Sequence, residues 1–160
     1  MKKWTLIILI ILGCFSSVNL RAQCDDGLIA EVADALGNFN YMKDYKVRME
    51  KMKKKNKMPP QISYSIILNE GKKYRFIINY AEDLPGKLKF EMFGQRSGIV
   101  LTNYDGLSNK YYNGVEFQCK ATAMYTVSLS FSDGQEGCGV VIVGFDEVKK
   151  NKYHSYFKNQ

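Results

Sequence analysis

Residues able to perform acid–base or nucleophilic chemistry are few in this sequence. The 160 residues include a single histidine, His154, and four cysteines. His154 lies near the end of a polar tail, so a Ser-His-Asp arrangement would need that tail to fold back over a site. No base is suggested beside any cysteine to activate it, and no HExxH, CxxC or glycine-rich phosphate motif is present. We expect a protein that is not an enzyme and that has no cofactor.

The carboxylates lie mostly in predicted turns, where an aspartate usually accepts hydrogen bonds from its own main chain. Asp105, with Asn103 and Asn109, could supply some of the roughly six to eight oxygens that calcium requires. A turn aspartate is the commoner outcome, so no metal site is predicted.

Three tyrosines stand apart from the rest because they lie in a polar stretch, from Asn103 to Gly114. Tyr104, Tyr111 and Tyr112 have amide neighbours there, Asn109 among them. Flat rings that keep a polar group can stack on a sugar while neighbouring amides bond to its hydroxyls. These four residues are the candidate glycan-binding set. The alternative for the tyrosines is to fold under the loop and plug the core.

Basic side chains concentrate in one segment. Residues 43–57 carry a net charge of +6, whereas the whole chain carries +7 and three of its basic residues precede residue 22. The rest of the domain is therefore slightly acidic, and nucleic-acid binding, which favours a basic face over the domain, is not expected. The segment is predicted to be a solvated loop; as a functional patch it would hold anionic glycans or lipopolysaccharide phosphate. Its lysines are Lys51, Lys53, Lys54, Lys55 and Lys57.

The N-terminus is typical of a secretory signal peptide. Lys2 and Lys3 precede a short apolar run, and Ala22 supplies a small residue at the exit. The run is too short to cross a bilayer, which takes about 20 residues. We predict cleavage after Ala22, which removes residues 1–22 and exports the rest to the periplasm or the extracellular space. The alternative is a lipobox ending at Cys14, whose lipidation would anchor the protein to a membrane.

The exported chain would retain three cysteines, so at least one has no intramolecular partner. Cys119 and Cys138 are predicted to lie at opposite ends of a hairpin, about 25 Å apart at about 3.3 Å per residue. A disulfide needs Cα atoms within about 7 Å. We predict either a Cys24–Cys138 disulfide or none, with Cys119 and Cys138 as buried core residues in the second case.

The elements that must position these residues are one short helix and a series of strands. Residues 25–37 have an apolar face at helical spacing and end at Gly37, which predicts a helix within an N-terminal segment, 23–43. A sandwich domain is expected over 44–146, and a polar basic tail over 147–160. Alternating apolar residues predict eight strands, at 45–49, 62–68, 74–78, 87–93, 99–102, 115–119, 124–131 and 138–145.

Pairing of these strands is predicted from the turns between them. Residues 69–72 read as the turn of a hairpin that joins 62–68 to 74–78. Strand 138–145 is apolar on both faces, which predicts a central strand covered on both sides. The whole is expected to be mainly β, an antiparallel, jelly-roll-like sandwich with one short helix.

Three motifs give the C-terminal half a family resemblance. Residues 69–76, 117–125 and 133–140 resemble small secreted proteins of Bacteroidota. The layout over about 60–145 is also similar to the bacterial pre-peptidase C-terminal sandwich and to the Golgi-dynamics (GOLD) sandwich. Ala123 stands where the family pattern often has glycine. The resemblance implies a non-catalytic accessory or binding role in the cell envelope or secretome, with an unknown protein partner or, alternatively, a glycan.

Overall fold

The computed structural model describes residues 26–53 and 58–147. Several sequence predictions concern residues outside these ranges. They are the signal peptide at 1–22, the tail after 147, Cys14, Cys24, Lys54, Lys55, Lys57 and His154.

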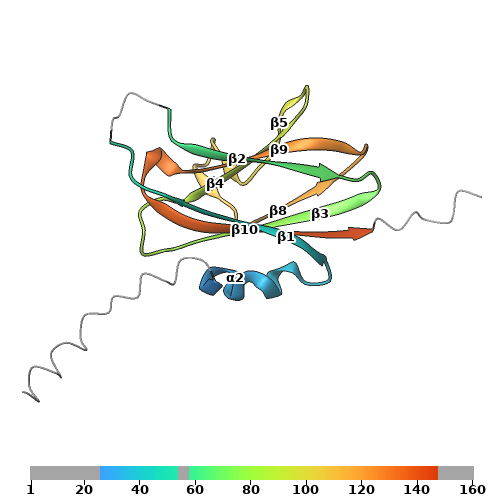
Figure 1. Ribbon diagram of the computed structural model, residues 1–160, viewed down its shortest axis with the longest axis horizontal. Helices are drawn as coiled ribbons and strands as arrows, with labels where there is room; N and C mark the ends of the chain where they lie inside the picture. Colours follow the sequence, from blue (N-terminus) through green and yellow to red (C-terminus); the bar gives the residue numbers. More distant parts are fainter. Residues whose placement is uncertain (1–25, 54–57, 148–160) are drawn as a thin grey trace, which may run out of the picture.

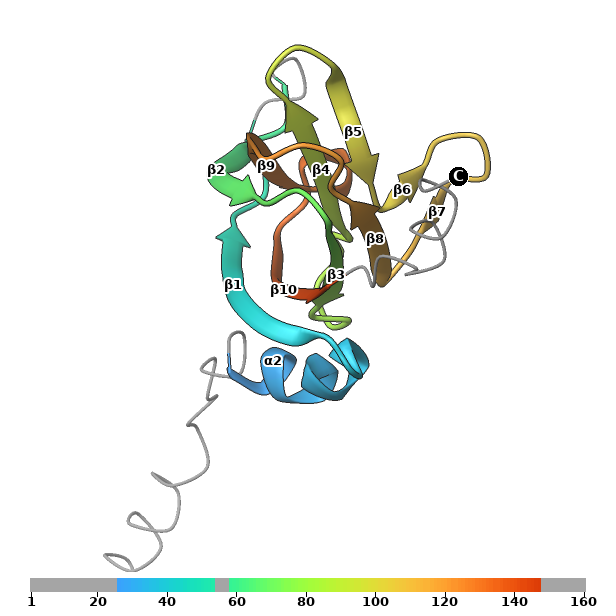
Figure 2. The same cartoon turned by 90° about the vertical axis from the view of Figure 1, so that its right-hand side faces the viewer.

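Two four-stranded antiparallel sheets face each other (Figures 1 and 2). The first sheet has the order β1 (Asn40–Met49), β10 (Gly137–Glu147), β3 (Lys72–Tyr80), β8 (Gly114–Gln118). The second has the order β2 (Gln61–Leu68), β9 (Ala123–Phe131), β4 (Leu88–Gly94), β5 (Gly98–Thr102). This order is that of a jelly roll, so the predicted sandwich is confirmed. Two further short strands, β6 (Tyr104–Asp105) and β7 (Lys110–Tyr111), pair only with each other.

The core forms between the sheets from side chains at every second strand position, as expected for strands with one buried face. Phe76 on β3 and Phe90 on β4 bring their ring centroids to 4.9 Å and join the two sheets. The alternation predicted from the sequence is confirmed in the inward sets of three strands. These are Tyr45, Val47 and Met49; Leu88, Phe90 and Met92; and Val127, Leu129 and Phe131.

Strand β10 is central and covered on both faces, as predicted. It lies between β1 and β3, and Val140, Val141, Ile142 and Val143 are all buried. Residues that point away from the core, Val140 and Ile142, contact the helical segment instead. A strand with an apolar run therefore has apolar neighbours on either side.

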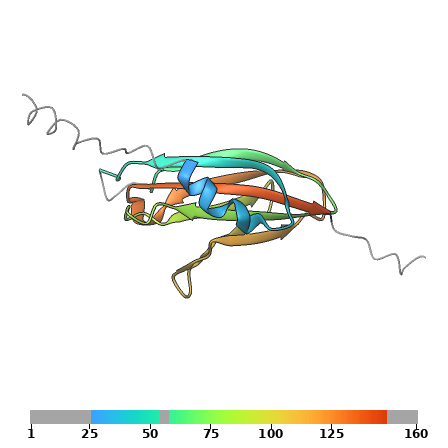
Figure 3. The ribbon, with the colours of Figure 1, turned by 90° about the horizontal axis from the view of Figure 1, so that it is seen from below.

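The helical segment consists of α2 (Asp26–Val32) and η3 (Ala33–Leu36), and it crosses the outer face of the first sheet (Figure 3). The predicted helix at 25–37 is thus confirmed, with Gly37 at φ 58° just after it. Two side chains of the first sheet, Asn79 and Arg75, form hydrogen bonds to this helical segment. The Asn79 amide donates to Leu28 O and to a Glu31 carboxylate oxygen. Arg75 donates to Leu36 O at 3.1 Å and thereby satisfies a carbonyl at the C-terminal end.

Two expected hairpins are wrong. Strands β2 and β3 follow each other in the chain, but β2 pairs with β9 and β3 pairs with β10 and β8. Strands β9 and β10 are likewise in different sheets. Gly71, at φ 78°, turns the chain from one sheet to the other rather than back along the same sheet. A tight glycine turn serves either purpose, so turn residues alone do not reveal which strands pair.

Candidate functional site

The β6–β7 hairpin projects from one side of the sandwich (Figures 2 and 3). It occupies the stretch from 103 to 114 that the sequence predicted to be a polar loop. Its tip is formed by residues 106–109 and carries Leu107, whose relative exposure is 101%. Leu107 is thus the most exposed of the large apolar side chains among the described residues.

Asn103 anchors the base of the hairpin to β4. Its side chain is completely buried, and its Oδ1 accepts a hydrogen bond of 2.8 Å from the main-chain N–H of Phe90. Its Nδ2 donates to Leu88 O and to Tyr112 O, at 3.0 and 3.2 Å. The amide therefore replaces main-chain hydrogen bonds of the β4–β5 pairing where β5 ends, and it holds both ends of the hairpin to the sheet.

Two tyrosine rings pack against each other on the hairpin above this anchor. The centroids of Tyr104 and Tyr111 lie 4.7 Å apart. Lys89 lies over the Tyr104 ring at 5.5 Å and Lys87 lies over the Tyr111 ring at 5.8 Å. Burial, and to a lesser degree the neighbouring Tyr104, raise the pKa of Tyr111 above its ordinary value of 10.0. Ring and cation contacts of this kind each stabilise by about 0.5–1 kcal/mol.

The tip is ordered by Asp105. One carboxylate oxygen accepts from the main-chain N–H of Leu107 at 2.9 Å, and the other accepts from the Ser108 hydroxyl at 2.6 Å. The Ser108 hydrogen bond first, and then that from Leu107, lower the pKa of Asp105. Asn109 has a left-handed φ of 52° and accepts from the Tyr104 hydroxyl. Asp105 is thus a turn residue, and the amide of Asn103 is turned inward rather than toward it.

The structure brings the four candidate glycan-binding residues together on this hairpin. However, Tyr104 and Tyr111 are half-buried and use ring faces on each other and on lysines. Tyr112 keeps the most open ring, at 42% exposure, with the Lys110 ammonium 5.0 Å from its centroid. The sequence predicted this gathering of residues but not the exposed leucine at the tip, for which a short polar stretch gives no signal.

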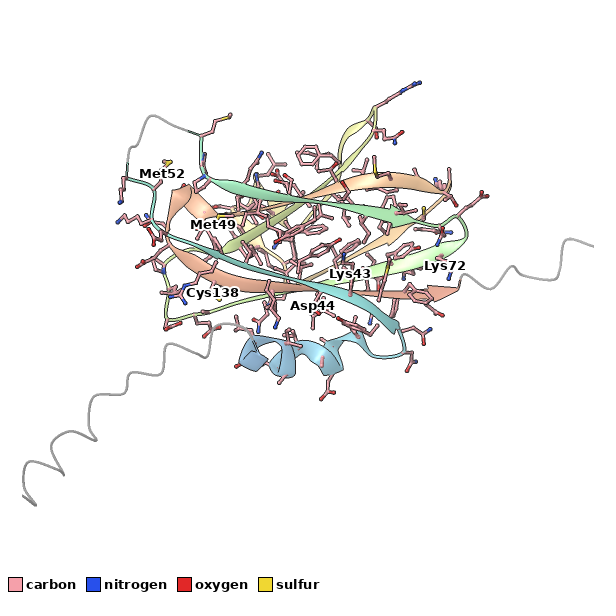
Figure 4. All side chains as sticks on the ribbon, in the orientation of Figure 1. Lys43, Asp44, Met49, Met52, Lys72 and Cys138 are labelled. Atoms are coloured by element: carbon pink, nitrogen blue, oxygen red, sulfur yellow. The ribbon has the colours of Figure 1, made fainter. Side chains whose placement is uncertain are left out.

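The described lysines of the basic segment, Lys51 and Lys53, are both exposed and flank Met52, which is labelled in Figure 4. Met52 donates its main-chain N–H to Gly134 O at 2.9 Å. This hydrogen bond fixes the segment at the end of the sandwich where β2 begins, because Gly134 follows β9 and Gln61 pairs with Ser130.

The two described cysteines differ in state. Cys119 is buried and free, whereas Cys138 is disulfide-bonded. Cys119 is hydrogen-bonded to Lys72 at one end of β3, and Cys138 to Ala81 beyond the other end. The length of β3, about 25–30 Å at about 3.3 Å per residue, separates them. The expectation that they do not pair with each other is confirmed, although the expected hairpin was wrong. The pairing of Cys138 with Cys24 stays a prediction.

Within 26–53 and 58–147, no three His, Cys, Asp or Glu side chains gather closely enough to hold a metal ion. Within the same ranges, no helix has the length and apolar character needed to cross a membrane.

Fold and site together define a jelly-roll sandwich domain with one anchored, projecting hairpin. No protein-family model matches the chain, and no curated protein matches it. Among solved structures, the chain is similar to Aeromonas hydrophila PliG, a periplasmic lysozyme inhibitor of g-type lysozyme. The two share 12% identity with a TM-score of 0.48, over 68% of this chain and 89% of that chain.

Proposed function

We propose that this protein is a non-catalytic, exported binding protein that engages a protein partner through the tip of its β6–β7 hairpin. The observation that carries the proposal is Leu107, a fully exposed leucine on a tip that is closed by two hydrogen bonds to Asp105. The family resemblance of residues 60–145 to accessory sandwich domains supports a non-catalytic role in the cell envelope or secretome.

The argument rests on preorganisation. A scattered surface leucine is ordinary, but Leu107 lies on a turn closed by Asp105, on a hairpin anchored by buried Asn103. Such a tip loses little conformational freedom when it binds, which leaves more of the interaction free energy for affinity. Moving one leucine side chain from water into an apolar pocket yields about 1.5–3 kcal/mol. A convex apolar tip of this kind fits a concave apolar pocket in a folded partner.

Site-directed photo-crosslinking in the native host tests the proposal. A photoreactive residue is placed at 107, and a matched one at Arg96, an exposed position in the turn between β4 and β5. We expect one protein to crosslink at 107 and not at 96. The purified partner should then bind the Leu107→Asp variant at least tenfold more weakly than the wild type, while Arg96→Asp has no effect.

Two results would contradict the proposal. One is crosslinking of the same proteins from both positions, which indicates random encounter. The other is an unchanged affinity of the Leu107→Asp variant for the crosslinked protein. Because Leu107 contributes nothing to the core, circular dichroism of that variant should match the wild type, and a folding defect is thereby separated from a binding defect.

Glycan binding is the second candidate, favoured by the open ring of Tyr112 beside Lys110. A glycan array with wild type, Tyr112→Ala and the triple alanine variant at Tyr104, Tyr111 and Tyr112 addresses it. A glycan that binds wild type and is lost in Tyr112→Ala supports this candidate. Equal signals from wild type and the triple variant exclude it.

A further inference from the structure

The two sheets have four edge strands, and three of them have features that discourage pairing with another strand. Strand β1 carries Asp44 and Arg48 and has an irregular register between Tyr41 and Lys43. Strands β5 and β8 are five residues long, and the register between β4 and β5 also shifts. Charge, irregular register and short length are the usual means by which proteins protect a sheet edge.

Strand β2 has none of these features. Its eight residues include no charged residue and no proline, and its register with β9 is unbroken from Gln61–Ser130 to Leu68–Ala123. Ile62 and Ile67 are 37% and 61% exposed. In the described part of the chain β2 pairs with β9 alone. The main-chain groups along its other side are therefore a template for one more strand.

The surroundings of this edge are basic. Strand β1 borders this edge across the side of the sandwich. The ring centroids of Tyr45 and Tyr64 lie 4.6 Å apart there, and the Tyr64 hydroxyl donates to Lys46 O. Residues 43–53 contain five basic and two acidic residues. Lys51 and Lys53 are exposed at the end where β2 begins. A strand added antiparallel to β2 would end beside these two lysines.

We propose that the β2 edge binds an extended segment of a partner protein, with a β-branched, uncharged centre and acidic residues at its C-terminal end. Main-chain hydrogen bonds would supply affinity, and the acidic end would supply orientation. A second copy of this chain fits less well. Antiparallel pairing of two β2 strands would bring Lys51 and Lys53 of one copy toward the turns that hold Lys72 and Lys120 of the other.

Amide hydrogen exchange with a synthetic peptide tests this inference. The probe is a ten-residue peptide of alternating valine and threonine that ends in two glutamates. At a concentration of about ten times Kd, we expect exchange of alternate β2 amides, those that do not bond to β9, to slow about tenfold. A peptide N-methylated at every second residue should not bind. Absence of β2 protection at about 1 mM peptide would overturn the inference.

Charge variants test the orientation. Lys53→Glu should weaken binding about three- to fivefold at low salt, and the matched surface variant Arg96→Glu should not. A peptide that ends in lysines should bind the wild type more weakly than the acidic peptide does. Equal binding of the two peptides would refute the charge argument. If the wild type forms a dimer in sedimentation and its β2 amides are protected without peptide, the inference is refuted and a second copy of the chain is the occupant of the β2 edge.

The proposal for the β2 edge and the proposal for the hairpin can be refuted independently. Strand β2 lies at the far edge of its sheet from β5, the strand that leads to the hairpin. We therefore expect Leu107→Asp to bind the peptide like the wild type. Loss of peptide binding in Leu107→Asp, with protection at residues 104–111, would place the peptide on the hairpin and overturn only the β2 inference.

Discussion

At the scale of single residues, Asn103 shows how a side chain can replace main-chain pairing. Strand β5 ends at Thr102, yet the next residue still bonds to Phe90 through both its main chain and its amide. Nothing in the sequence distinguishes this asparagine from others in the same polar stretch. Complete burial and a full set of partners distinguish it in the structure, because a buried amide is tolerated only when it is hydrogen-bonded.

Asn103→Ala should lower the free energy of unfolding by about 2–4 kcal/mol, because it leaves the N–H of Phe90 and the carbonyls of Leu88 and Tyr112 without this partner. Urea denaturation measures the change. Asn113→Ala, at an exposed position of the same stretch, is the control and should change the free energy of unfolding by less than about 0.5 kcal/mol. Equal effects of the two substitutions would contradict the role of Asn103 as an anchor.

The ion pairs of Glu116 with Lys73 and Arg75 should make the stability of the protein depend on pH. Hydrogen bonds from Lys73, and then from Arg75, lower the pKa of Glu116 below its ordinary value of 4.5. A lowered folded-state pKa contributes stability above the unfolded-state pKa, and this stability is lost as the pH falls through the folded-state value. Glu116 and its two basic partners are partly exposed. We therefore expect the free energy of unfolding of the wild type to exceed that of Glu116→Gln by about 0.5–1 kcal/mol at pH 7.

That difference should shrink toward zero as the pH falls through the lowered pKa of Glu116, because the protonated carboxyl resembles glutamine. Parallel urea titrations of the two proteins between pH 7 and pH 2.5 measure it. The exposed turn residue Glu82 provides a control, because Glu82→Gln should track the wild type across the range. A difference that stays constant with pH would show that the ion pair is not its cause.

At the scale of elements, the helical segment packs so closely on β10 that one glycine is required there. A Cβ at Gly144 would lie 2.7 Å from Leu36 Cδ2 and 3.0 Å from Phe39 Cβ, whereas a Cβ at Gly27 on α2 would meet nothing within 4 Å. Gly144→Ala should therefore lower the unfolding free energy by about 1–3 kcal/mol. Gly27→Ala should raise it by up to about 0.5 kcal/mol, since alanine favours a helix. Thermal unfolding of both variants measures the effects, and a neutral Gly144→Ala would contradict the described packing.

The positions of the strands were more predictable from the sequence than the strands with which they pair. Period-two patterns located the strands around Tyr45, Phe90 and Val127, and the doubly apolar run at Val140 located the central strand. Pairing was not predictable, because the connection through Gly71 crosses between sheets with the same residues that close a hairpin. Strands β6 and β7 have two residues each, too few for any period. The tyrosines of the candidate site were found by their type, whereas Leu107 is identified only by exposure on a folded tip.

At the scale of the whole molecule, cysteine chemistry provides a test of export and pairing together. A chain that begins at Gln23 and holds a Cys24–Cys138 disulfide should have one free thiol, Cys119. Intact mass after alkylation in denaturant should show one adduct without reduction and three with reduction. Without denaturant the buried Cys119 should react slowly. Three adducts without reduction would contradict the disulfide, and a mass that begins at a diacylated Cys14 would replace the prediction of simple secretion.

The central position of β10 sets a condition on when the domain can fold. Strand β10 separates β1 from β3, so the first sheet closes only when residues 137–147 insert between β1, which begins at residue 40, and β3, which begins at residue 72. Folding of such a chain is dominated by contacts distant in sequence, which makes it slow, in the range of milliseconds to seconds. During synthesis, a chain that has not yet released β10 from the ribosome cannot complete its first sheet. It would therefore remain incompletely folded until the last strand is made.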